Sequence, residues 1–154
     1  MESSPLHSNG IESSSERTIG LIKAVLESGN SVELPASGYS MFPTLRPDDR
    51  VIVKPGFKGE FPIPGNVVVY EKTGVFVMHR LMEIIEGNDG NHLFISRGDQ
   101  GIKQDEPWSQ QQLLGIAISY KRGDKEHSIR SYIPGVWRYR LNRRLLWIYN
   151  RRQA

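Results

Sequence analysis

The sequence contains no cysteine. This absence excludes disulfide bonds, thiol catalysis and zinc sites built on thiolate ligands. The chain also lacks any uncharged apolar run close to the roughly 20 residues that a membrane-spanning helix needs. Its first 16 residues are polar and acidic, without the basic and apolar regions of a signal peptide. These absences predict a soluble, cytoplasmic protein.

Acidic residues are absent after Glu126, although the whole chain has 17 of them and 20 basic residues. Seven arginines lie beyond that point: Arg130, Arg138, Arg140, Arg143, Arg144, Arg151 and Arg152. The first 126 residues therefore hold 13 basic and 17 acidic groups. The body of the protein is mildly acidic and its C-terminal tail is strongly basic, which favours contact of the tail with an acidic partner or surface.

A length of 154 residues with 38% hydrophobic residues fits one modest domain with polar ends. Residues 1–12 are rich in serine and predict a disordered N-terminus. Residues 13–30 predict one amphipathic helix, because Ile19, Ile22 and Leu26 recur at helical spacing before Gly29. One helix is too little for a helix-turn-helix, so the sequence does not predict a DNA-reading domain of the repressor type, and nucleic acid is the least expected partner.

Residues 31–134 change to β-branched runs separated by turn signals, which predicts a mainly β domain with a coiled antiparallel sheet. The predicted strands are SVELPASG, RVIVKP, NVVVYEK, VFVMHRLMEII, HLFISRG and LLGIAISYKRG. The segment NDGN at residues 88–91 is typical of a hairpin turn.

Residues 135–154 predict a basic C-terminal helix. Trp137, Leu141, Leu145 and Ile148 form an apolar stripe along it, with arginines mostly elsewhere. Three interpretations stay open. The helix packs on the sheet, it lies against anionic lipid or a protein partner, or it contacts nucleic acid.

The most specific segment is SGYSMFPTLRPDDRVIVKP, at residues 37–55. Gly38 allows a sharp backbone turn, and Pro43 restricts the chain just beyond the serine. Together they predict that Ser40 stands at a rigid, exposed corner, as a nucleophile requires.

A serine hydroxyl needs a neighbouring base to act as a nucleophile. His79, in the predicted strand VFVMHRL, is the candidate, whereas His7, His92 and His127 lie at the N-terminus or at turn edges. A histidine base in turn needs a carboxylate to orient it. Asp99 and Asp105 both follow the next strand, and the sequence alone leaves the choice between them open. It contains no metal-loop or cofactor-binding pattern, so no cofactor is predicted.

These segments resemble the conserved boxes of the LexA and type I signal peptidase superfamily of serine peptidases. GYSMFPTLRPDDRVIV is similar to the nucleophile box G-x-S-M-x-P-T-L-x-x-G-D, and GNVVVYE to the box G-D-x-V-x-F. VMHRLMEII resembles the strand that bears the base, and ISRGDQ resembles the T-K-G-D-N box. The four boxes occur in the family's order over about residues 35–120.

The resemblance implies a LexA- or signal-peptidase-like coiled β fold and a role for each matched residue. His79 occupies the position at which one branch of the family has histidine rather than lysine. Ser40 would be the nucleophile and His79 the base, with Asp105 or Asp99 orienting the imidazole. The residues around the nucleophile would bind substrate or the oxyanion: Gly38, Tyr39, Met41 and Pro43.

The chain departs from the family pattern in several places. Gly38 stands where signal peptidases often have an oxyanion-binding serine, and Asp48 and Asn66 replace a Gly and an Asp of two boxes. The Ala-Gly and Cys-Gly dipeptides at which LexA-like proteins cut themselves are absent. We therefore predict a serine endopeptidase that cleaves a separate peptide or protein precursor. The alternative is a non-catalytic peptide-binding or regulatory module that retains the peptidase fold.

Overall fold

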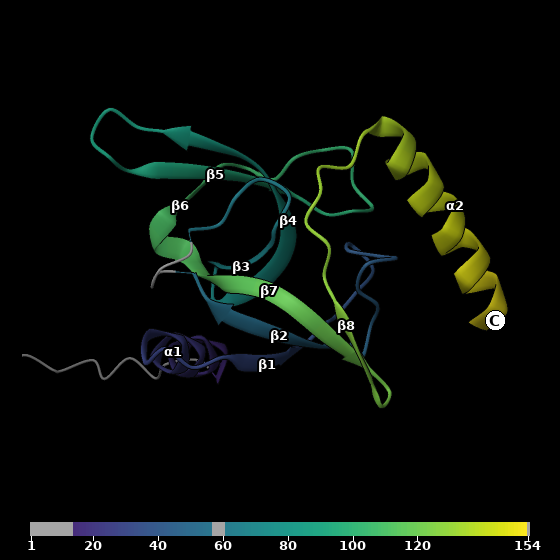
Figure 1. Ribbon diagram of the computed structural model, residues 1–154, viewed down its shortest axis with the longest axis horizontal. Helices are drawn as coiled ribbons and strands as arrows, with labels where there is room; N and C mark the ends of the chain where they lie inside the picture. The colour runs from purple at the N-terminus through teal and green to yellow at the C-terminus, as the bar shows by residue number, and fades with distance from the viewer. Residues whose placement is uncertain (1–13, 57–60, 154) are drawn as a thin grey trace, which may run out of the picture.

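The computed structural model describes residues 14–56 and 61–153 (Figure 1). The prediction of disorder for residues 1–12 lies outside these ranges. The described elements are, in order, α1 (Ser14–Glu27), β1 (Val32–Pro35), β2 (Arg50–Pro55), β3 (Val67–Lys72), β4 (Val75–Glu86), β5 (His92–Arg97), β6 (Trp108–Ser109), a 3-10 turn (Gln110–Gln112), β7 (Leu113–Arg122), β8 (Lys125–Ser128) and α2 (Val136–Gln153).

The strands form one antiparallel sheet in the order β1-β2-β7-β3-β4-β5-β6, with β8 paired to β7. The predicted fold class, mainly β with one helix at each end, is confirmed. Two short strands were not predicted. β6 has only two residues and β8 is exposed throughout, so neither carries an apolar alternation.

β3 is buried on both of its faces, which explains its unbroken run of β-branched residues. Because successive strand side chains point to opposite faces, Val67 and Val69 enter one hydrophobic cluster while Val68 and Tyr70 enter another. The first cluster lies between α1 and the sheet, and the second lies among β3, β4, β5 and β6.

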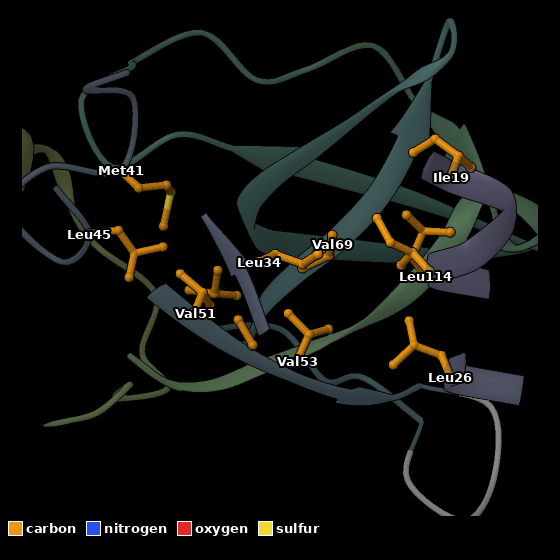
Figure 2. Close-up of a cluster of buried hydrophobic side chains, with 12 residues drawn as sticks. Ile19, Leu26, Leu34, Met41, Leu45, Val51, Val53, Val69 and Leu114 are labelled. Carbon is orange, nitrogen blue, oxygen red and sulfur yellow. The ribbon is translucent and has the colours of Figure 1, made fainter. Parts of the chain in front are cut away.

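The first cluster extends from the N-terminal helix to the segment between β1 and β2. Figure 2 shows Ile19 and Leu26 of α1 at one end and Met41 and Leu45 at the other. Burying such side chains stabilises the fold by about 1.5–3 kcal/mol each. The core therefore fixes the chain at Met41, immediately after the candidate nucleophile.

α2 stands beside the sheet rather than across its face (Figure 1). Among its residues only Asn142 is buried, and its polar contacts go to loops rather than to strands. Of the three interpretations of this helix, packing on the sheet is therefore not what the structure shows. No helix in the described ranges is long and apolar enough to cross a membrane.

Candidate active site

Ser40 is exposed on a tight turn between β1 and β2. Gly38 has a positive φ of 68°, a conformation that favours glycine. The turn is closed by hydrogen bonds from Phe42 N to Tyr39 O at 3.0 Å and from Leu45 N to Met41 O at 3.0 Å. Met41 is 4% exposed and anchors the turn in the core. The corner predicted for the nucleophile is thus held on both sides of Ser40.

His79 lies on β4 directly opposite Val68 of β3. Side chains that are paired in this way share a face of the sheet, and the next residue on the strand points to the other face. His79 therefore points toward one side of the sheet and Arg80 toward the other. The Nδ1 atom of His79 lies 2.7 Å from Oδ2 of Asp105, and both side chains are less than one-fifth exposed.

The carboxylate of Asp105 is held by more than the histidine. Oδ2 also accepts hydrogen bonds from Ser96 Oγ at 2.6 Å and from the Tyr70 hydroxyl at 3.2 Å. The Asp105 N–H donates to Ser96 O at 2.8 Å, and Trp108 Nε1 donates to Ser96 Oγ at 3.0 Å. These contacts fix the carboxylate, and through it the ring of His79.

The same contacts set the protonation states around His79. Burial raises the pKa of Asp105, but hydrogen bonds from His79, Ser96 and Tyr70, with the charge of His79, lower that pKa below its ordinary value overall. Burial, reinforced by the charge of Asp105, raises the pKa of Tyr70 to about 12 although Ser96 opposes it. At neutral pH Asp105 is an anion and Tyr70 keeps its proton as a hydrogen-bond donor.

Gly98 lies between Ser40 and His79. A Cβ atom added at Gly98 would stand 3.3 Å from His79 Nε2 and 3.3 Å from Ser40 Cβ. Those two atoms are therefore no more than twice this distance apart, with only a glycine between them. The hydroxyl of Ser40 makes no hydrogen bond to another described residue. Catalytic hydrogen bonds are often long in unliganded enzymes and tighten when substrate binds.

The carboxylate of Asp99 is hydrogen-bonded to residues other than His79. Its two carboxylate oxygens accept hydrogen bonds from Arg80 Nε at 2.8 Å and Arg80 Nη2 at 2.9 Å, and Thr44 Oγ1 donates to Oδ2 at 2.6 Å. Arg80 and Asp99 are fully buried side chains. Arg80 also donates to the carbonyl oxygens of Gly65 and Arg130. Asp99 thus connects the segment that carries Ser40 and Thr44 to β4. The carboxylate that is hydrogen-bonded to the imidazole is that of Asp105.

Gln100 connects three parts of the site. Its backbone N–H donates to Ser40 O at 2.9 Å, and its side-chain nitrogen donates to Phe42 O and to Asn142 O, each at 2.9 Å. Asn142 Nδ2 in turn donates to Asp99 O at 3.1 Å. The ring of Tyr149 lies 5.1 Å from that of Phe42. α2 is therefore docked on the two loops that carry Ser40 and Asp99.

A cavity of about 200 Å³ opens beside Ser40. Its walls come from the end of β1 and the residues after it, and from Phe76, Val77 and Met78 of β4. Of the residues predicted to bind substrate or the oxyanion, Gly38 and Met41 line this cavity. Tyr39 instead lies beside Tyr149 of α2, with ring centroids 6.3 Å apart. Pro43 is not part of the cavity wall and follows a cis peptide bond from Phe42.

Two of the departures from the family pattern have structural roles. Asp48 has a positive φ of 71°, the conformation that a glycine at this position adopts without strain. Asn66 Oδ1 accepts a hydrogen bond from Ile63 N at 3.0 Å, and its Nδ2 donates to Ser131 Oγ at 3.2 Å. The remaining described histidines lie elsewhere: His92 contacts Phe61, and His127 stacks on Tyr120.

Several residues of the site were not singled out from the sequence: Tyr70, Arg80, Ser96, Gly98 and Gln100. The segments VMHRLMEII and ISRGDQ contain Arg80, Gly98 and Gln100. The sequence therefore pointed to these segments as part of the site, but not to these three residues. Tyr70 and Ser96 read as ordinary strand residues, and only the pairing of β3, β4 and β5 brings them to Asp105.

The described ranges contain no group of three or more His, Asp or Glu side chains placed to hold a metal ion. A scan against models of known protein families finds no match to the chain, and a search of the curated proteins finds none either. The geometry around Ser40, His79 and Asp105 and the four sequence boxes are therefore what indicate a function.

Proposed function

We propose that the protein is a serine endopeptidase that cleaves a cytoplasmic peptide or protein precursor through an acyl-enzyme intermediate. The observation that carries the proposal is the His79–Asp105 hydrogen bond through Nδ1, with the second ring nitrogen, Nε2, near Ser40 beside Gly98. A nucleophile, a base and a carboxylate that orients the base are the elements of a serine-protease centre.

In the proposed reaction His79 Nδ1–H donates to Asp105, which leaves the lone pair of Nε2 free to accept the Ser40 proton. Ser40 Oγ then attacks the scissile carbonyl carbon, and protonated His79 gives its proton to the leaving amine as the C–N bond breaks. Water, deprotonated by His79, attacks the acyl ester. The carboxylic acid product leaves, and the proton returns to Ser40 Oγ.

The tetrahedral intermediates carry a negative oxygen that needs donors. The Ser40 N–H has no acceptor among the described residues, so it can donate to this oxygen. Losing one such donor typically costs about 10²–10³ in rate. Gly38 occupies the position at which signal peptidases often have a serine whose hydroxyl binds the oxyanion. In this chain, backbone N–H groups would therefore donate most of the hydrogen bonds to the oxyanion.

Two unpaired strand edges support a peptide as the substrate. β5 pairs with β4 only from Arg80 onward, which leaves the edge of residues 75–79 without a strand partner in the described ranges. Among the described strands, β1 pairs with β2 alone. Pro35 at the end of β1 and residues 76–78 of β4 line the cavity beside Ser40. An extended peptide can add as a strand to such an edge, with its side chains alternating into pockets. The small cavity and the family resemblance both favour small residues before the cut.

The test is labelling of the purified protein with a fluorophosphonate, which reacts with an activated serine. The proposal predicts a phosphonate adduct on Ser40 in the wild type, and its loss in Ser40→Ala and in His79→Ala. Ser37→Ala is the matched control, because Ser37 is an exposed serine on the wall of the same cavity, and it should label normally. Absence of label in the wild type, or label that persists in Ser40→Ala, would favour the non-catalytic peptide-binding module.

A further inference from the structure

The outer face of α2 carries large apolar side chains in water. Trp137 is 72% exposed and Trp147 is 56% exposed, and Val136 and Ile148 are exposed beside them. Soluble proteins rarely leave such side chains together on one surface without a partner. The opposite face of the helix, which includes Asn142 and Tyr149, is the one docked on the Ser40 and Asp99 loops.

Arginines share one line of the helix with these tryptophans. Spacings of three and four residues place side chains on the same side of a helix, and five exposed residues follow this rule: Trp137, Arg140, Arg144, Trp147 and Arg151. We name this set the Trp-Arg stripe. The guanidinium of Arg151 lies 4.1 Å from the centre of the Trp147 ring.

Charge defines the chemistry of the partner. α2 contains no acidic residue, and none occurs in the chain after Glu126, whereas the first 126 residues carry more acidic than basic groups. An anionic surface therefore attracts α2 and repels the body of the protein, so the molecule is oriented with the Trp-Arg stripe toward that surface.

The apolar members of this face favour a lipid surface over a nucleic acid. Tryptophan and arginine are the residues of helices that lie in the interface of anionic membranes, where the indole rests at headgroup level and arginine extends to the phosphates. Nucleic-acid binding by stacking uses free aromatic faces, and Arg151 already lies over one face of the Trp147 ring. Val136 and Ile148 have no role in a phosphate contact.

We infer that α2 binds the surface of an anionic membrane through the Trp-Arg stripe. Its opposite face holds the nucleophile segment through Asn142, Gln100 and Tyr149, so the bound helix places Ser40 close to the headgroups. If the proposed peptidase activity holds, its substrates are presented at that surface. The binding itself does not depend on the activity.

The experiment is sedimentation of the full chain with vesicles of phosphatidylcholine alone and of phosphatidylcholine mixed with phosphatidylglycerol. We expect binding to the mixed vesicles only, weakened by added salt, with Trp emission shifted to shorter wavelength. Trp108 is buried, so the shift reports on Trp137 and Trp147. The triple variant Arg140→Gln, Arg144→Gln, Arg151→Gln should bind roughly 100-fold more weakly, since each arginine near the surface contributes about 1 kcal/mol.

The control variant removes three exposed positive charges elsewhere, by Arg17→Gln, Lys72→Gln and Lys125→Gln, and should bind as the wild type does. Circular dichroism of both variants checks that the fold is kept. Equal loss of binding in the two variants would show a non-specific charge effect and overturn the inference. Failure of the wild type to sediment with mixed vesicles at low salt would also overturn the inference. Binding of RNA at the same phosphate concentration would not rescue it.

Discussion

Oδ2 of Asp105 lies 2.7 Å from Nδ1 of His79 and also accepts hydrogen bonds from Ser96 and Tyr70. A carboxylate held in this way keeps the imidazole proton on Nδ1. The lone pair is then on Nε2, the nitrogen that stands next to Ser40 across Gly98. The proposed function requires this tautomer, because only a neutral Nε2 can take the serine proton.

Replacing Asp105 by Asn should remove most of the peptidase activity. The Asn amide would donate to Nδ1 and move the imidazole proton to Nε2, where it blocks proton transfer from Ser40. We expect kcat to fall by about 10²–10⁴-fold with little change in KM, measured on any cleaved peptide. Asp124→Asn, on an exposed turn, is the control. A near-normal kcat of the Asp105→Asn variant would show that Asp105 does not contribute to catalysis.

The stability that Asp105 contributes should depend on pH. Burial raises its pKa, but the hydrogen bonds it accepts lower that pKa overall in the folded protein. Asp105 therefore stabilises the fold above the unfolded-state pKa of about 3.9, and this contribution is lost as the pH falls through the lower folded-state pKa. The difference in free energy of unfolding between wild type and Asp105→Asn should be larger at about pH 5 than at about pH 2.5. Urea titrations at the two pH values measure it, and a larger difference at the lower pH would contradict this pKa direction.

The buried ion pair between Asp99 and Arg80 should matter for folding far more than a surface pair does. Asp99→Asn leaves the Arg80 charge buried without its counter-ion, so we expect the free energy of unfolding to fall by about 3–5 kcal/mol. Lys23→Gln, which breaks the partly exposed pair with Glu71, should cost no more than about 1 kcal/mol. Urea unfolding of both variants tests the contrast, and similar losses would mean that the Asp99–Arg80 network does not hold the loop.

Gly98 should be intolerant of even one added methyl group. In Gly98→Ala the methyl carbon would stand 2.8 Å from Ser40 O as well as close to Nε2 of His79, so the nucleophile turn must shift. We expect a loss of activity on the order of 10²-fold, as for other small misplacements of reacting groups. Gly101→Ala, in the same loop, meets nothing closer than 3.5 Å and should remain active. Equal activity of the two variants would show that the space beside Gly98, between Ser40 and His79, is not needed for the reaction.

Local patterns in the sequence predicted the strands well. The run RVIVKP has the same bounds as β2, and the NDGN segment does form the turn between β4 and β5, with Gly87 N donating to Asn91 O at 2.7 Å. Alternation and turn chemistry are properties of neighbouring residues, so a single chain reveals them.

The choice between Asp99 and Asp105 could not be made from the sequence, because it depends on long-range pairing. The β4–β5 register puts Ser96 opposite Leu81, on the same face of the sheet as His79, and Asp105 is bonded to Ser96. The position of α2 could not be predicted from the sequence either, because the helix is docked through the buried side chain of Asn142 rather than through its apolar stripe. A polar residue within an arginine-rich helix gives no signal of burial.

The most direct test of the proposed function is cleavage of a diverse peptide library, read by mass spectrometry, with wild type, Ser40→Ala and His79→Ala compared at equal concentration. The proposal predicts a set of cuts in the wild type that follow small residues and disappear in both variants. Cuts that survive either substitution, or no cuts by the wild type, would contradict a Ser40–His79 peptidase.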